Sequence, residues 1–223
     1  MSPMPDFYQS ETEQLRAEIA GLAARLIAED GADYGTAKRK AAKQILGNNK
    51  IRGEVMPDNA QIEDEVRLYN ELFFGDTQPA RLKHLRQVAL QVMQELERFS
   101  PYVVGAVLNG TAGDHSDIHL QLFASSPKDV EIYLLNKNVN FEVSETPHFR
   151  GGSQMMETLS FLLPQRGADP EGVHLTLYDI DDLRGSARSG PGKRAERADA
   201  AALRRLMEEE EARAGQPHSE ENS

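Results

Sequence analysis

The chain has 223 residues, of which 39% are hydrophobic and 27% charged, enough for one domain or two small ones with a buried core. It contains no cysteine, which excludes disulfides, thiolate metal sites and thiol nucleophiles. Its apolar runs are too short to cross a membrane, and residues 1–9 lack the pattern of a signal peptide, so we expect a cytoplasmic protein without a membrane partner.

The net charge of −11 is concentrated in the middle of the chain. Residues 101–183 carry 4 basic and 12 acidic side chains, a net of −8, whereas residues 1–100 have a net of −3 and residues 184–223 a net of zero. An acidic surface repels phosphate backbones unless a cation bridges them, which argues against simple coating of nucleic acid. A divalent-cation site also needs acidic groups, although a solvated acidic face is the commoner reason for such a bias.

The first hundred residues have the pattern of four helices. Apolar residues recur at helical spacing over residues 7–28, and a basic helix is expected over residues 34–46, where a solvated charged face is a commoner explanation than an RNA contact. A third helix follows the turn at residues 57–59, where Asp58 or Asn59 can cap it. A fourth covers residues 79–99 and ends before Pro101. We therefore expect a helical domain over residues 1–100.

Beyond Tyr102 the apolar pattern changes to that of strands. Strands are expected over residues 103–108, 116–123, 139–145, 158–163 and 173–178, with one helix over residues 127–136. Asp179, Asp181 and Asp182 follow the last strand and are better explained by capping of a short helix than by a metal. A helical region followed by a small mixed sheet is an α+β fold. The sheet domain covers residues 101–183, and residues 184–223 form a polar tail, partly helical and disordered from about residue 216.

The most informative segment lies between the first two predicted strands and reads Asn-Gly-Thr-Ala-Gly-Asp-His-Ser-Asp-Ile-His over residues 109–119. Gly110 lets backbone N–H groups approach a phosphate, and Thr111 adds a hydroxyl donor. Asp117 and His119 are two residues apart on a strand, so they project from one face and can hold one divalent ion. Asn109 and Gly110 also fit a plain β-hairpin turn, which needs no ligand.

This segment resembles the nucleotidyltransferase superfamily, the fold of DNA polymerase beta, whose signature is a strand, Gly-Ser or Gly-Gly, and Asp-hydrophobic-Asp on the next strand. The resemblance covers about residues 102–145 and implies a nucleotidyltransferase-like domain with a small mixed sheet. It implies that Gly110, Thr111 and Ser116 contact a triphosphate and that Asp117 is the first metal ligand. It also implies Mg²⁺ or Mn²⁺, an NTP, and transfer of a nucleoside monophosphate to an acceptor, which could be RNA, a protein or a small molecule.

Two positions differ from the signature and leave alternatives open. His119 stands where the family has its second acid, and Glu142 or Glu145 would supply a third. Histidine is a softer ligand without negative charge, so magnesium binding should weaken. The chain is then either an enzyme with Asp117 and His119 in catalytic roles or a catalytically degenerate relative that binds a nucleotide or a partner. A helical interaction protein is a third hypothesis, and His174 is expected to be a half-buried strand residue.

Overall fold

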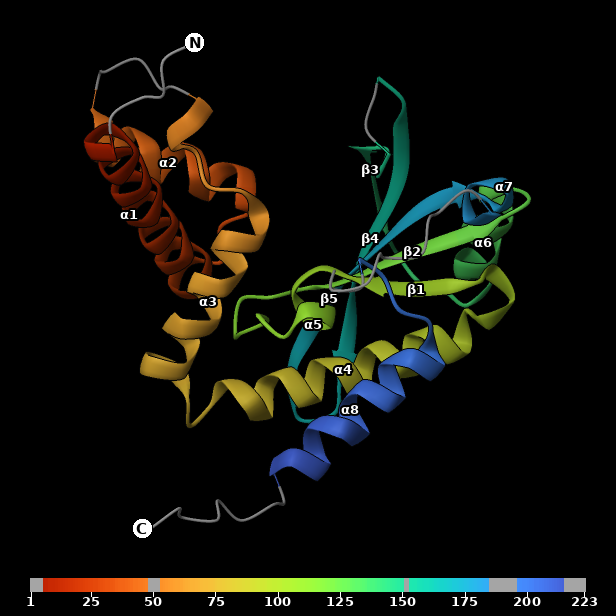
Figure 1. Ribbon diagram of the computed structural model, residues 1–223. Coiled ribbons are helices and arrows are strands. Elements are labelled where there is room, and N and C mark those ends of the chain that lie inside the picture. Colours follow the sequence, from red (N-terminus) through yellow and green to blue (C-terminus); the bar gives the residue numbers. More distant parts are fainter. Residues whose placement is uncertain (1–5, 48–52, 151–152, 185–195, 215–223) are drawn as a thin grey trace. The chain divides into compact units, whose positions relative to one another are not determined.

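A computed structural model describes residues 6–47, 53–150, 153–184 and 196–214. The architecture is α+β, as the sequence predicts, with a helical N-terminal region and one five-stranded mixed sheet (Figure 1). The chain divides into two compact units. The first unit comprises residues 1–82 and 110–116, and the second comprises residues 83–109 and 117–223.

The first unit is built from helices whose ends are set by local side chains. They are α1 (Asp6–Asp30), α2 (Tyr34–Leu46), the 3₁₀ turn η1 (Gly53–Val55), α3 (Asn59–Phe74) and the start of α4 (Gln78–Glu95). Asp33 caps α2 by accepting a hydrogen bond from the N–H of Thr36, and Asp58 forms a capping box with Gln61 at the start of α3. These helices confirm the helical prediction for this part of the chain.

The second unit contains the sheet, whose strands lie in the order β1-β2-β5-β4-β3. The strands are β1 (Pro101–Val104), β2 (Ile118–Ala124), β3 (Glu142–Pro147), β4 (Met155–Gln165) and β5 (Ala168–Asp179). β2 pairs with β5 in parallel, whereas the β1–β2, β4–β5 and β3–β4 pairs are antiparallel. One prediction is wrong: the apolar run 103–108 is not one strand, because Gly105 takes a φ of 69° and the chain continues as α5 (Gly105–Asn109).

The sheet has an apolar face and a polar face because its side chains alternate along each strand. The apolar side chains of the central strands are buried, namely Ile118, Leu120 and Leu122 on β2 and Val173, Leu175 and Leu177 on β5. Buried side chains of α4, α6 (Pro127–Asn136) and α8 (Ala200–Ala214) complete the core of this unit. On the polar face, the strand registers align His119, His174, Ser160 and Glu142 in one row across β2, β5, β4 and β3.

A segment near the C-terminus covers the open edge of β1. Ala198 forms two backbone hydrogen bonds with Val103, of 2.8 and 3.0 Å. The guanidinium of Arg197 lies 5.0–5.6 Å from the ring centres of Tyr102, Phe123 and Phe149. These contacts fasten the segment to the sheet through both backbone pairing and cation–π attraction.

The ends of the chain test two further predictions. The N–H of Asp181 donates to Asp179 (2.8 Å) at the start of α7 (Ile180–Arg184), so the predicted capping of a short helix by an aspartate is confirmed. The predicted tail helix is present as α8, and the predicted disorder from about residue 216 lies outside the described residues.

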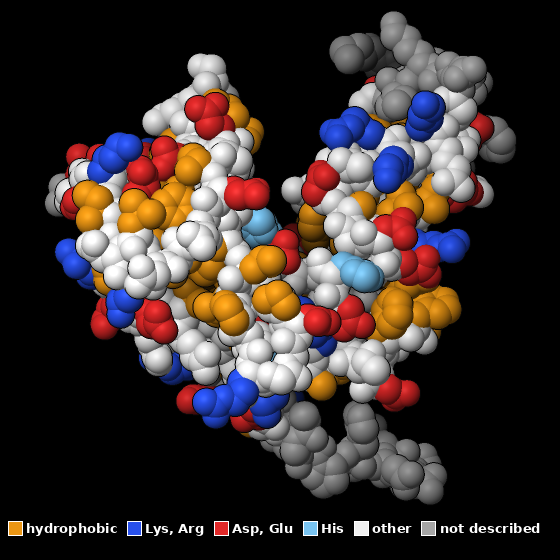
Figure 2. Space-filling model, turned by 180° about the vertical axis from the view of Figure 1, so that it is seen from behind, with side chains coloured by type: hydrophobic (Ala, Val, Ile, Leu, Met, Phe, Trp, Pro, Cys, Tyr) orange, Lys and Arg blue, Asp and Glu red, His pale blue; other side chains and the backbone are white. Residues whose placement is uncertain are grey.

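The described surface mixes charged and apolar side chains. Apolar side chains reach the surface in both units (Figure 2), including Leu72 and Phe73 on α3 and Val143 and Leu162 on the β3–β4 pair. Among the helices of the described ranges, none has the length and apolar character needed to cross a bilayer.

Among the described residues of the second unit, Arg86 is the largest buried polar side chain, with 2% of its surface exposed. Its guanidinium donates to the carbonyl oxygens of Val107 (2.9 Å) and Leu108 (3.2 Å) at the end of α5. It also forms an ion pair with Glu210 of α8, which runs beside α4 (Figure 1). One buried cation therefore joins α4, α5 and α8.

Replacing Arg86 should destabilise the second unit strongly. In Arg86→Met the two carbonyl groups lose their donor, and we expect a loss of about 3 kcal/mol in the free energy of unfolding. Lys83→Met is the matched control, because Lys83 pairs with Glu211 between the same two helices but is exposed, and exposed pairs contribute at most about 1 kcal/mol. Urea unfolding followed by circular dichroism measures both, and equal losses would contradict the role assigned to Arg86.

Candidate functional site

The loop predicted to contact a triphosphate, residues 110–116, packs against helices of the first unit. Gln78 donates its side-chain N–H groups to the carbonyl oxygens of Gly110 (3.2 Å) and Ala112 (2.7 Å). Asn70 donates to the carbonyl oxygen of Thr111 (3.2 Å), and Thr111 itself is buried. Two amides from the helical unit therefore fix three successive peptides of this loop.

The loop also closes on itself at Ser116. The hydroxyl of Ser116 accepts a hydrogen bond from the N–H of Gly113 (3.0 Å), and the N–H of Ser116 donates to the carbonyl of Gly113 (3.1 Å). The alternative of a tight hairpin turn at Asn109 and Gly110 is wrong, because α5 and this loop separate β1 from β2. Contact of Gly110, Thr111 and Ser116 with a triphosphate stays a prediction.

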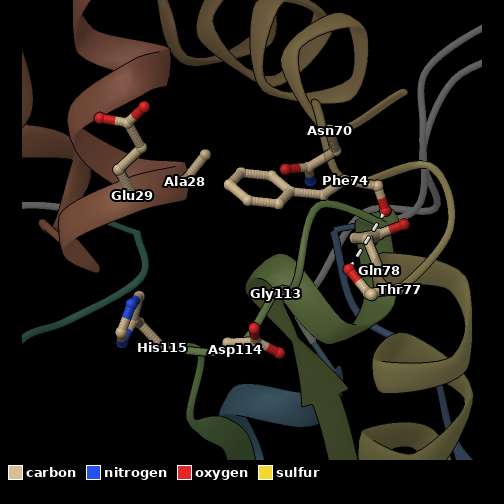
Figure 3. Close-up of a pocket in the computed structure, with 9 residues that line it drawn as sticks. All are labelled: Ala28, Glu29, Asn70, Phe74, Thr77, Gln78, Gly113, Asp114 and His115. Atoms are coloured by element: carbon tan, nitrogen blue, oxygen red, sulfur yellow. Dashed lines mark hydrogen bonds between the residues drawn. The ribbon is translucent and has the colours of Figure 1, made fainter. Parts of the chain in front are cut away.

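A cavity of 210 Å³ lies beside this loop within the first unit (Figure 3). Its lining comprises Ala28, Glu29, Asn70, Phe74, Thr77, Gln78, Gly113, Asp114 and His115, and Phe74 points across it toward α1. The hydrogen bond from Tyr69, and then that from Arg25, lower the pKa of Glu29, so this carboxylate is ionised at pH 7. Because Glu29 and Asp114 both bring negative charge, this cavity disfavours a phosphate unaccompanied by a cation.

A second polar site lies on the sheet of the second unit, around Asp117. The carboxylate of Asp117 is 3.0 Å from Nε2 of His174, and Nδ1 of the same ring is 2.8 Å from the hydroxyl of Ser160. Asp117 lies just before β2, His174 lies on β5 and Ser160 lies on β4. These three strands are adjacent in the sheet. They line a cavity of 510 Å³ together with Asn140, Phe141, Glu142, Phe161, Leu162 and Gly172.

Gly172 sets the position of the Asp117 carboxylate. A Cβ atom at position 172 would clash with Oδ1 of Asp117. The carboxylate therefore rests directly on the backbone of β5, two residues before His174. Only glycine leaves this space open while Asp117 bonds His174.

His119 stacks on His174, with ring centres 4.6 Å apart and planes 14° from parallel. Desolvation of the ring, followed by the neighbouring His174, lowers the pKa of His119 to about 4, and Asp117 offsets part of this shift. Water reaches the exposed part of His119 and weakens these effects without changing their direction. His119 is therefore uncharged at pH 7.

The structure does not bring the three predicted metal ligands together on neighbouring strands. Asp117 and His119 belong to the β2 segment, whereas Glu142 lies on β3, with β5 and β4 between them. Across the described residues, no group of three or more histidine and acidic side chains is arranged to hold a metal ion. The metal roles of Asp117, His119 and Glu142 stay predictions.

Sequence reasoning missed the partners of Asp117. His174 was expected only to be a half-buried strand residue, which it is, with 28% of its side chain exposed. No sequence motif marks Ser160. The alternation of β4 and β5 indicates which residues share a face, but the pairing that makes Ser160, His174 and Asp117 neighbours depends on the strand order, which alternation does not reveal.

No protein-family model matches this sequence, and neither does any curated protein. Two solved structures of the Cid1 poly(U) polymerase resemble part of the chain, one with MgGTP bound and one of a mutant bound to MgATP. Their sequence identities are 15% and 14%, and their TM-scores are 0.33 and 0.32. Each match covers 51% of this chain and 38% of the polymerase, so the chain spans well under half of that protein. A structural likeness with so low a TM-score says nothing about the function of this chain.

The contact between Asp117 and Gly172 can be tested with a double-mutant cycle. In Gly172→Ala the new methyl group displaces the carboxylate, and we expect a loss of about 1 kcal/mol in the free energy of unfolding, chiefly from the broken hydrogen bond to His174. In an Asp117→Ala background the same substitution should cost clearly less, because the obstructing group is gone. Strictly additive losses in urea unfolding would show that the two residues do not interact.

The lowered pKa of His119 predicts how stability changes with pH. The unfolded ring binds a proton near its ordinary pKa of 6.5 and the folded ring only near about 4, so the folded state loses stability as the pH falls through this window. NMR titration of His119 should give a midpoint well below 6.5, and His119→Gln should lose less stability than the wild type between pH 7 and pH 4.5. A titration midpoint near 6.5 would show that burial does not desolvate the His119 ring.

Proposed function

We propose that the second unit is a nucleotidyltransferase-type sheet whose polar face binds a nucleotide without metal-dependent transfer. The observation that carries this proposal is the hydrogen bond between Asp117 and His174, because it engages the carboxylate expected to hold the metal. The neighbouring His119 is neutral and softer than a carboxylate, and magnesium prefers oxygen ligands. These residues therefore fit a magnesium site poorly.

The charge of the site favours recognition of the nucleoside part over the triphosphate. Asp117 and Glu142 both line the cavity of the second unit and repel a phosphate that lacks a cation. The cavity nevertheless offers uncharged hydrogen-bonding side chains, namely Asn140 and Ser160. Such groups, with the stacked His119 and His174, suit a base and a sugar.

Calorimetric titration with ATP, GTP, CTP and UTP, each with Mg²⁺, with Mn²⁺ or with EDTA, tests this proposal. We expect one base to be preferred, and we expect the metals to change its Kd by less than about threefold, which is under 1 kcal/mol. The nucleoside alone should bind nearly as tightly as its triphosphate. Binding that requires a metal and disappears in Asp117→Ala would instead support the active enzyme. No binding of any nucleotide would overturn the nucleotide assignment.

The variant His119→Asp tests whether the site is a metal site that lacks its second acid or a site whose function needs histidine. The new carboxylate would stand beside Asp117 where the family has its second acid, so this variant should gain Mg²⁺-dependent binding of an NTP if the surrounding sheet is unchanged. His119→Asn is the matched control, since it has nearly the same size and no charge. Equal metal dependence in the two variants would show that the missing acid is not what limits metal binding.

A further inference from the structure

Ser160, His174 and Asp117 are joined in the order nucleophile, base and orienting acid. Asp117 is 3.0 Å from Nε2 of His174, so an ionised carboxylate accepts the proton carried on that nitrogen. Nδ1 then has a free lone pair and accepts the hydroxyl proton of Ser160 at 2.8 Å. This is the arrangement that activates a serine, since the base contacts the nucleophile and a third group orients the base.

The backbone of the sheet holds this arrangement in place. Ser160 and His174 are direct partners in the antiparallel β4–β5 register. Asp117 is fixed from the other side, because its carboxylate rests on Gly172. His119 stacks on the ring of His174 and limits its rotation. Ser160 and His174 are therefore placed by neighbouring strands, and Asp117 lies immediately before β2.

The cavity beside these residues indicates which compounds can reach Ser160. Its volume of 510 Å³ is within the range of roughly 300–1,000 Å³ that small-molecule sites have. Phe141 and Leu162 give it apolar surface, whereas Asp117 and Glu142 give it negative charge. A small neutral or cationic ester suits this lining, and an anionic one does not.

We propose that Ser160 is a nucleophile that accepts an acyl group from small neutral or cationic esters bound in this cavity. The hydroxyl proton of Ser160 passes to Nδ1 of His174 as the serine oxygen bonds to the carbonyl carbon of the ester. The bond from that carbon to the alkoxy oxygen then breaks, and the alcohol leaves with this proton. Water, deprotonated by the same ring, hydrolyses the acyl-serine to a carboxylic acid and restores Ser160. Asp117 stabilises the charged ring during both steps.

Labelling with a neutral fluorophosphonate tests this proposal on the full chain, because the reagent forms a stable bond with activated serines. Trypsin cleaves after Arg150 and Arg166, which gives one peptide with Ser160 and Ser153, and tandem mass spectrometry distinguishes the two serines. Ser144 is the internal control, since it lies exposed on β3 of the same sheet and appears in the separate peptide after Lys137. We expect the label on Ser160 in the folded protein and none on Ser144.

Variants show whether His174 and Asp117 cause this reactivity. His174→Gln should slow labelling of Ser160 by about 100-fold, the lower range for loss of a general base. Asp117→Asn should slow it less, and Ser144→Ala should leave it unchanged. Labelling of Ser160 no faster than of Ser144, or equally fast in His174→Gln of unchanged circular dichroism, would overturn the proposal. Calorimetric titration of Ser160→Ala with nucleotides measures nucleotide binding independently of labelling, so the nucleotide proposal and the nucleophile proposal can fail independently.

Discussion

The parallel pairing of β2 with β5 is the constraint on which the sheet site depends. It places His174 beside His119 and brings the start of β2 next to Gly172. Asp117 can then reach the ring of His174 across the backbone of β5. In an antiparallel pairing the same residues would meet different partners, so the site is a consequence of strand order as much as of side-chain type.

The local signals in this sequence predict its helices well. Asp58 caps α3 where a short polar side chain before an apolar repeat predicts a helix start, and Asp179 does so before α7. The alternation of β2 likewise predicts which of its side chains are buried. The strand expected over residues 103–108 fails because apolar content does not report the backbone turn at Gly105, after which the same residues form α5.

The candidate sites are less predictable because their contacts join residues far apart in sequence. Asn70 and Gln78 hold a loop about 30 to 40 positions away, and no motif marks either amide. Ser160 is one of several strand serines, and what distinguishes it chemically from Ser144 is the partner that the fold gives it, His174. A short pattern such as Gly-Thr followed by Ser-Asp-Ile-His therefore locates a region of interest but does not determine its chemistry.

Histidine in place of acid changes what the polar face can do. Two or three carboxylates at close range repel one another and need a cation, whereas one carboxylate beside two imidazoles is stable without it. The carboxylate of Asp117 then orients a ring, and that ring can accept a proton from a hydroxyl. The polar face can therefore form hydrogen bonds without a bound cation, so metal dependence and Ser160 reactivity are the two properties that test what it does.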